Sequence, residues 1–162
     1  MLTEIISRTP TWVFVLFFTL VFLGYRQSKT RKVNLRTLLI LPIAMTIFSI
    51  IGVKSAFNLQ IFSIVAWFVG LTISYFVCNQ LSSKKAEYLS EDEQFEIPGS
   101  WLPLILMMAI FWVKYIVAVL LAKELAVTET VSFIVSVSFI YGTFSGIFAA
   151  RAKGYLQAKV LV

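Results

Sequence analysis

The residue that could most readily take part in chemistry is Lys114, because it is the one ionisable residue well inside a long apolar run of the sequence. If a helix runs from about 101 to 121, Lys114 lies about 4–5 Å from its middle, since a helix rises by about 1.5 Å per residue. A lysine near the centre of a lipid bilayer costs at least about 2.5–3.5 kcal/mol on insertion scales. We therefore expect Lys114 to face other helices or a wet cavity, and not lipid.

No acidic residue lies at the depth of Lys114, so its hydrogen bonds must go elsewhere. We expect a backbone carbonyl, a buried water or hydroxyl groups at comparable depth, and the candidate hydroxyls are Ser49, Ser63, Ser136 and Ser138. Three roles for Lys114 are open. It is structural, or a fixed positive charge in a pathway or pocket for an anionic or lipid group, or a general base beside a serine nucleophile. We favour the structural role and place the general base last, because no motif marks such a serine.

The remaining composition excludes several kinds of chemistry. The chain has no histidine, so histidine general acid/base catalysis and histidine-ligated zinc or haem cannot be built from it. Its single cysteine, Cys78, permits neither an internal disulfide nor a CxxC redox pair. We predict no catalytic residue, no cofactor and no metal site.

Two ridges of small residues, spaced by four, are candidates for close helix packing. Small side chains let two backbones approach, which matters in lipid because no hydrophobic force drives helices together there. We favour packing within one chain, and a homodimer through the last apolar run is the alternative. The ridges are Ser138, Gly142, Gly146 and Ala150 on the last run, and Ala66, Gly70 and Ser74 on the third.

The composition indicates that transmembrane helices must position these residues. Of the 162 residues, 59% are hydrophobic and 14% are charged, whereas soluble domains are about 45–50% apolar and about 25% charged. Five apolar runs are long enough to cross a bilayer. The sequence therefore predicts an all-α membrane protein, a single domain over 1–162 built as a bundle of five transmembrane helices at about 11–25, 35–53, 59–78, 101–121 and 130–150.

The distribution of basic residues predicts the orientation. Ten Lys and Arg residues lie beside the spans on one side, against three on the other, namely Arg8, Lys54 and Lys123. Cytoplasmic loops carry the excess of Lys and Arg, so we expect the N-terminus outside and the C-terminus in the cytoplasm. Five of the ten form a basic loop that is a candidate contact for anionic lipid headgroups: Arg26, Lys29, Arg31, Lys32 and Arg36.

The predicted cytoplasmic loop 79–99 is the longest connection. Its polar run SSKKAEYLSEDEQ is followed by FEIPG, an alternating piece closed by a turn pair. This pattern allows a short hairpin. We favour a solvated linker, because charged runs of this kind usually remain unstructured.

Three short pieces together carry a resemblance to a known family: TPTWVF at 9–14, LILPIAM at 39–45 and PGSWLPL at 98–104. They resemble a family of small uncharacterised bacterial inner-membrane proteins, classed as a domain of unknown function. The resemblance extends over nearly the whole chain. It implies a multi-pass helical fold in the bacterial inner (cytoplasmic) membrane, and it brings no activity, substrate, cofactor or site residue.

These observations favour a non-enzymatic integral membrane protein that acts by interaction, as an assembly factor or accessory subunit. The alternative is a small oligomeric transporter or channel with Lys114 as an intramembrane positive charge. The expected partners are anionic lipid headgroups of the bilayer and a second copy or another membrane protein. The net charge of +6 is typical of cytoplasmic membrane loops, so we expect no nucleic-acid partner.

Overall fold

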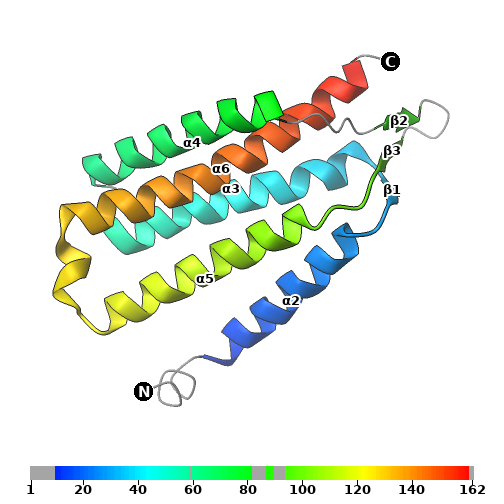
Figure 1. Cartoon of the computed structure of the whole chain (residues 1–162). Helices are drawn as coiled ribbons and strands as arrows, with labels where there is room; N and C mark the ends of the chain where they lie inside the picture. Colours follow the sequence, from blue (N-terminus) through cyan, green and yellow to red (C-terminus); the bar gives the residue numbers. More distant parts are fainter. Residues whose placement is uncertain (1–9, 59, 82–86, 90–93, 161–162) are drawn as a thin grey trace.

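The computed structural model describes residues 10–58, 60–81, 87–89 and 94–160, in which five long helices lie side by side (Figure 1). The elements in chain order are α2 (Thr11–Gln27), β1 (Arg31–Val33), α3 (Leu35–Phe57), α4 (Ile61–Leu81), β2 (Glu87–Leu89), β3 (Gln94–Ile97), α5 (Leu102–Ala122), the 3₁₀ turn η1 (Ala126–Glu129) and α6 (Val131–Val160).

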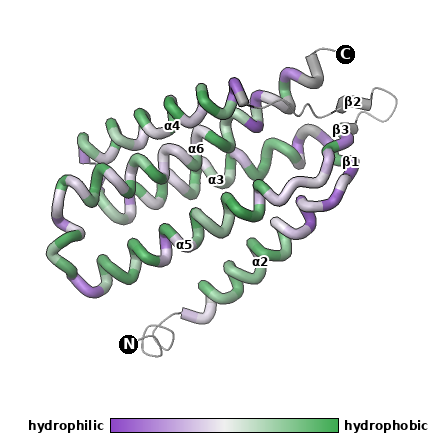
Figure 2. The backbone as a smooth tube through the Cα atoms, in the orientation of Figure 1, coloured by the Kyte–Doolittle hydropathy of each residue, from purple (hydrophilic) through white to green (hydrophobic). Residues whose placement is uncertain are grey.

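Four of the helices are long and apolar enough to cross a membrane. Their apolar spans are Arg36–Phe57, Ile61–Gln80, Leu102–Ala122 and Val131–Gly154, and α2 is a shorter apolar helix of 17 residues. Figure 2 shows hydrophobic residues along the helices and hydrophilic ones gathered toward the strands and the ends. The predicted helical bundle is confirmed, whereas the crossing of α2 and the orientation stay predictions.

Three helices extend past the apolar spans that the sequence predicts. Helix α3 continues past 53 to Phe57, α4 past 78 to Leu81, and α6 past 150 to Val160. The spans follow hydropathy, whereas a helix satisfies its own backbone hydrogen bonds and can continue into water once the apolar run ends. Helix α3 ends where Asn58 adopts a left-handed backbone with φ of 49°, a conformation typical of helix ends.

The helices form two packing groups. Helix α6 packs along α4 and α3, whereas α5 packs mainly on α2 and makes few contacts with α3 and α6. A buried polar network joins the first group: Ser49 of α3 donates to the carbonyl of Tyr141 on α6 at 2.8 Å, and Trp67 of α4 donates to the Ser49 hydroxyl at 3.0 Å. The group α3, α4 and α6 is therefore held by backbone packing and by hydrogen bonds.

The two small-residue ridges meet between α4 and α6 of the same chain. A Cβ atom added at Gly142 would clash with the backbone of Trp67, and one at Gly146 would clash with the Leu71 carbonyl. The reverse holds from α4, since a Cβ at Gly70 would clash with the Phe139 carbonyl. This is the intramolecular arrangement that the sequence analysis favours.

A three-stranded antiparallel sheet, in the order β1-β3-β2, lies at one end of the bundle (Figure 1). Strand β3 pairs with both neighbours, so that Val33 and Tyr88 are opposite Phe95, which is fully buried. The solvated-linker interpretation of 79–99 is therefore wrong at 87–89 and 94–97. It failed because the pairing partner β1 comes from a distant connection; residues 82–86 and 90–93 lie outside the described part.

The sheet joins the two packing groups at this end. Strand β1 lies in the connection from α2 to α3, and β2 and β3 lie in the connection from α4 to α5. The connection from α4 to α5 also contacts the end of α2, where Ser100 donates its backbone N–H to the Gln27 carbonyl at 3.0 Å. Two of the three connections between the groups are thereby tied together at the sheet end.

Substitution on the α6 ridge tests the close packing of α4 and α6. We expect Gly142→Ala to destabilise the folded protein by about 1–3 kcal/mol, the usual penalty of overpacking, because the Trp67 backbone cannot yield. Gly154→Ala is the matched control on the same helix, since nothing lies within 4 Å of its added Cβ. Thermal unfolding of both variants in a mild detergent measures the difference. Equal stability of the two variants would contradict this packing.

Candidate functional site

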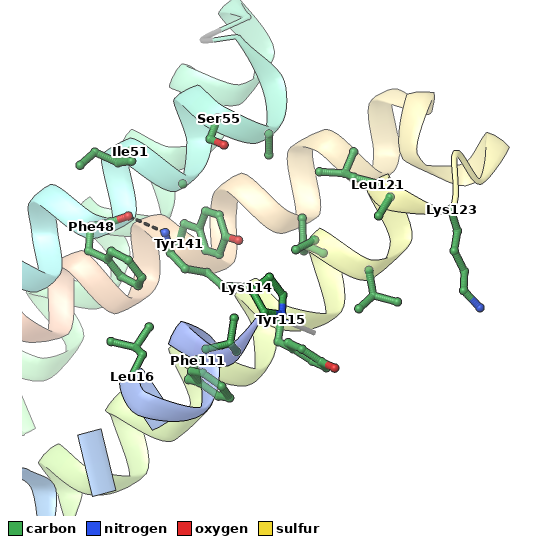
Figure 3. Close-up of a pocket in the computed structure, with 18 residues that line it drawn as sticks. Leu16, Phe48, Ile51, Ser55, Phe111, Lys114, Tyr115, Leu121, Lys123 and Tyr141 are labelled. Carbon is green, nitrogen blue, oxygen red and sulfur yellow. Dashed lines mark hydrogen bonds between the residues drawn. The ribbon is translucent and has the colours of Figure 1, made fainter. Parts of the chain in front are cut away.

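A cavity of about 790 Å³ lies between α2, α3, α5 and α6 (Figure 3). Its walls come from the start of α2, the last turns of α3 and α5, and Tyr141 of α6. These segments are at the end of the bundle away from the sheet. The cavity thus occupies the boundary between the two packing groups, at the end where the sheet does not tie them. We call it the Lys114 cavity.

Lys114 projects from α5 toward α3, so its predicted inward orientation is confirmed. Its ammonium donates to the Phe48 carbonyl at 2.6 Å (Figure 3) and lies 3.6 Å from the centroid of the Phe48 ring. The Tyr141 ring centroid is 5.4 Å from the same nitrogen. A carbonyl oxygen and two aromatic faces therefore stabilise the positive charge of Lys114.

The predicted hydroxyl groups do not accept a hydrogen bond from Lys114. Ser49 is bonded to Tyr141 and Trp67, and Ser63 donates to the Gln60 carbonyl at 2.6 Å within its own helix turn. Ser138 is fully buried, and its hydroxyl has no hydrogen-bond partner among the described residues. Ser136 is exposed. The backbone carbonyl, given as one alternative, is the acceptor that the structure uses.

Gly52 makes the room that Lys114 occupies, a role that was not predicted from the sequence. A Cβ atom at Gly52 would lie 2.6 Å from the Lys114 Nζ and 3.0 Å from the Tyr141 ring. Gly52 lies one helical turn after Phe48, so the turn that supplies the carbonyl also supplies the gap. A glycine inside an apolar helix was the available signal, because it typically marks close approach of another group.

No carboxylate lines the cavity among the described residues. Its polar side chains are those of Lys114, Ser55, Tyr115, Tyr141 and the exposed Lys123, and the rest of the wall is predominantly aliphatic and aromatic. An intramembrane cation normally pairs with an acid or faces a functional cavity. Here Lys114 faces a cavity, and the described wall contains no acid to pair with it.

The space beyond Lys114, toward the sheet, is filled. Buried apolar side chains from α2, α3, α5 and α6 form one cluster there, with Met107 and Phe148 almost fully buried. Phe111 belongs to this cluster and also lines the cavity. The cavity therefore ends against packed side chains near the middle of α5, and in this conformation it is a pocket and not a pore.

The other predicted residues lie apart from the cavity. The basic loop is at the sheet end, where Arg26 lies 6.0 Å from the Phe22 ring and Lys29 lies 5.3 Å from the Tyr25 ring. Arg31 and Lys32 are part of β1, and Arg36 is in the first turn of α3. In the described part of the chain, no group of three or more His, Cys, Asp or Glu residues is placed to hold a metal ion.

Comparison with known proteins identifies a family. A model described as Family of unknown function (DUF6622) matches residues 1–160. No curated protein and no solved structure matches the chain.

A double-mutant cycle tests whether Gly52 makes room for Lys114. We expect Gly52→Ala to destabilise the wild type by about 1–3 kcal/mol, because the added methyl group displaces the ammonium from the Phe48 carbonyl. In a Lys114→Ala background the displaced atoms are gone, so the same substitution should cost clearly less, giving a coupling free energy of about 0.5–3 kcal/mol. Chemical or thermal unfolding of the four proteins in detergent measures it. Purely additive effects of the two substitutions on the free energy of unfolding would show that Gly52 does not make room for Lys114.

Proposed function

Because the chain belongs to this family of unknown function, its role must be argued from the site, and we propose that it is a non-enzymatic membrane protein that binds the anionic group of a ligand at Lys114. The ligand occupies the Lys114 cavity, and binding serves an accessory or assembly role in the membrane. The sequence favours a purely structural role for Lys114. Such a role explains its contact with the Phe48 carbonyl, but it does not explain the open space beside the ammonium.

The observation that carries this proposal is a lysine ammonium facing a cavity of about 790 Å³ that has no carboxylate in its described wall. A helix bundle that needed only to neutralise Lys114 would fill the surrounding space with side chains, as it does on the sheet side. An anionic ligand supplies the missing counter-charge, and charge-assisted hydrogen bonds are the strong ones in a low-dielectric setting.

The geometry gives little support to a catalytic role. Among the described residues Lys114 makes no hydrogen bond to a serine, and the Ser49 hydroxyl is committed to the Tyr141 carbonyl. A serine nucleophile activated by lysine needs the two groups within hydrogen-bond reach. These contacts favour binding over acyl transfer.

Transport by an oligomer is the second candidate, and the cavity favours it over a channel. A pocket open at one end and closed by a packed cluster at the other is one state of an alternating-access cycle. Such a cycle would require the cluster around Met107 to open while the ligand stays at Lys114.

We also propose the placement in the cell that the charges favour. The sheet end carries the basic loop and faces the cytoplasm of a bacterial inner membrane, where its lysines and arginines contact anionic headgroups. The cavity then lies in the outer half of the bilayer. The start of α2 and the end of α6 lie at opposite ends of the bundle, as an odd number of spans requires (Figure 1).

The ligand proposal is tested by what co-purifies with the protein. We expect the full chain, purified in a neutral detergent from bacterial membranes, to retain an acidic small molecule that Lys114→Gln retains at least about tenfold less. The magnitude follows from losing one charge-assisted contact of about 1.5–3 kcal/mol. Mass spectrometry of extracts from equal amounts of folded protein measures the ratio.

Lys54→Gln is the matched control, because it removes an equal charge from an exposed residue in the last turn of α3 that does not line the cavity. It should retain the acidic molecule at nearly the wild-type level. Identical extracts from the wild type and Lys114→Gln, with both proteins folded, would refute the proposal.

A further inference from the structure

The size and chemistry of the Lys114 cavity narrow the class of ligand, an inference that rests on the proposed function. We propose that the ligand is an anionic amphiphile with a single hydrocarbon chain, such as a long-chain carboxylate. Its acid group lies at the Lys114 ammonium, and its chain lies against the apolar wall that α3 and α5 provide.

The acid end follows from the lack of an acidic partner for Lys114 among the described residues. An ammonium has three N–H donors, and the bond to the Phe48 carbonyl is the one hydrogen bond that the described residues give it. The Phe48 and Tyr141 rings lie near the same ammonium, and the cavity beside it has no carboxylate in its described wall. A carboxylate or another acid group completes both the hydrogen bonding and the charge.

The hydrocarbon part of the ligand follows from the apolar side chains that line the cavity. On α5 the cavity is lined beyond Lys114 by Val117, Ala118 and Leu121, and on α3 by Ile51 and Ala56. A small hydrated anion would leave the space beside these residues to water, which apolar walls hold poorly. A hydrocarbon chain fills it with contacts of matching chemistry.

The volume of the cavity is sufficient for one hydrocarbon chain. Taking a methylene group to occupy about as much space as a water molecule, roughly 30 Å³, a cavity of about 790 Å³ holds roughly 26 such groups. One chain of about 18 carbons with its acid group therefore fits within the cavity.

The route of entry agrees with a lipid-like ligand. Ile51 lines the cavity and is 55% exposed on the outer surface of α3, and Ala118 of α5 also lines it and is exposed. The cavity wall is thus continuous with the surface that the membrane covers. A membrane-dissolved amphiphile reaches Lys114 without crossing water.

The test uses oleate as the probe, with the full-length protein in a neutral detergent and thermal unfolding as the readout. At about a hundredfold excess over its Kd, oleate should raise the wild-type Tm by about 5 °C or more. Oleyl alcohol, which has the same chain without the charge, should raise it much less. Lys114→Gln should lose the difference between the two probes.

A steric variant tests the chain position separately from the charge. Ala118→Phe fills the apolar part of the cavity and keeps Lys114, so the oleate effect should fall sharply. Ile116→Phe adds a ring to the outer face of the same helix, where Ile116 is 53% exposed and does not line the cavity, and should leave the oleate effect unchanged.

Two further probes separate the failure of this inference from the failure of the proposed function. If dioleoylphosphatidylglycerol or inorganic phosphate, but not oleate, stabilises the wild type through Lys114, the anionic site stands and the single-chain ligand is wrong. If no anionic probe acts through Lys114, both the site and the ligand class are overturned.

Discussion

The constraint on which the rest of this structure depends is that a lysine ammonium cannot be left among lipid tails. Lys114 lies two residues past the midpoint of α5 and so about 3 Å from it, where it must find oxygen or aromatic partners within the protein. It finds them on α3, through the Phe48 carbonyl and ring. Helix α5 packs mainly on α2, and this contact links it across the cavity to the other helices.

The position of the cavity follows from how the two packing groups are connected. At one end the three-stranded sheet ties the connection after α2 to the connection before α5, and an apolar cluster fills the space between the helices. At the other end a single connection through η1 joins α5 to α6. The groups are therefore closely packed near the sheet and separate toward η1, and Lys114 lies where the packed region ends.

The sequence predicts much of this arrangement, because bilayer physics acts on each helix locally. Apolar run lengths locate the five helices, and the energetic penalty on Lys114 turns it inward. Spacing by four identifies Gly70, Gly142 and Gly146, and the need of five helices for neighbours favoured a partner helix in the same chain over one in a second copy. That choice depends on how α4 and α6 are placed in three dimensions.

What the sequence did not predict depends on pairs that are distant in the chain. Strand β1 completes a sheet with residues more than fifty positions away, and no local pattern in a three-residue strand signals it. Similarly, the hydroxyl of Ser49 was a reasonable partner for Lys114 by depth, but Tyr141 and Trp67 already engage it. Gly52 acquires its role only because Lys114 and Tyr141 approach it from two other helices.

The most direct measurement is an experimental structure of the full chain in lipid nanodiscs, resolved well enough to position the Lys114 side chain. We expect the ammonium within hydrogen-bond reach of the Phe48 carbonyl or of the acid group of a bound ligand, beside an open cavity between α3 and α5. A Lys114 side chain extended to the headgroups on the lipid-facing surface, with the cavity filled by neighbouring side chains, would contradict the binding site that we propose.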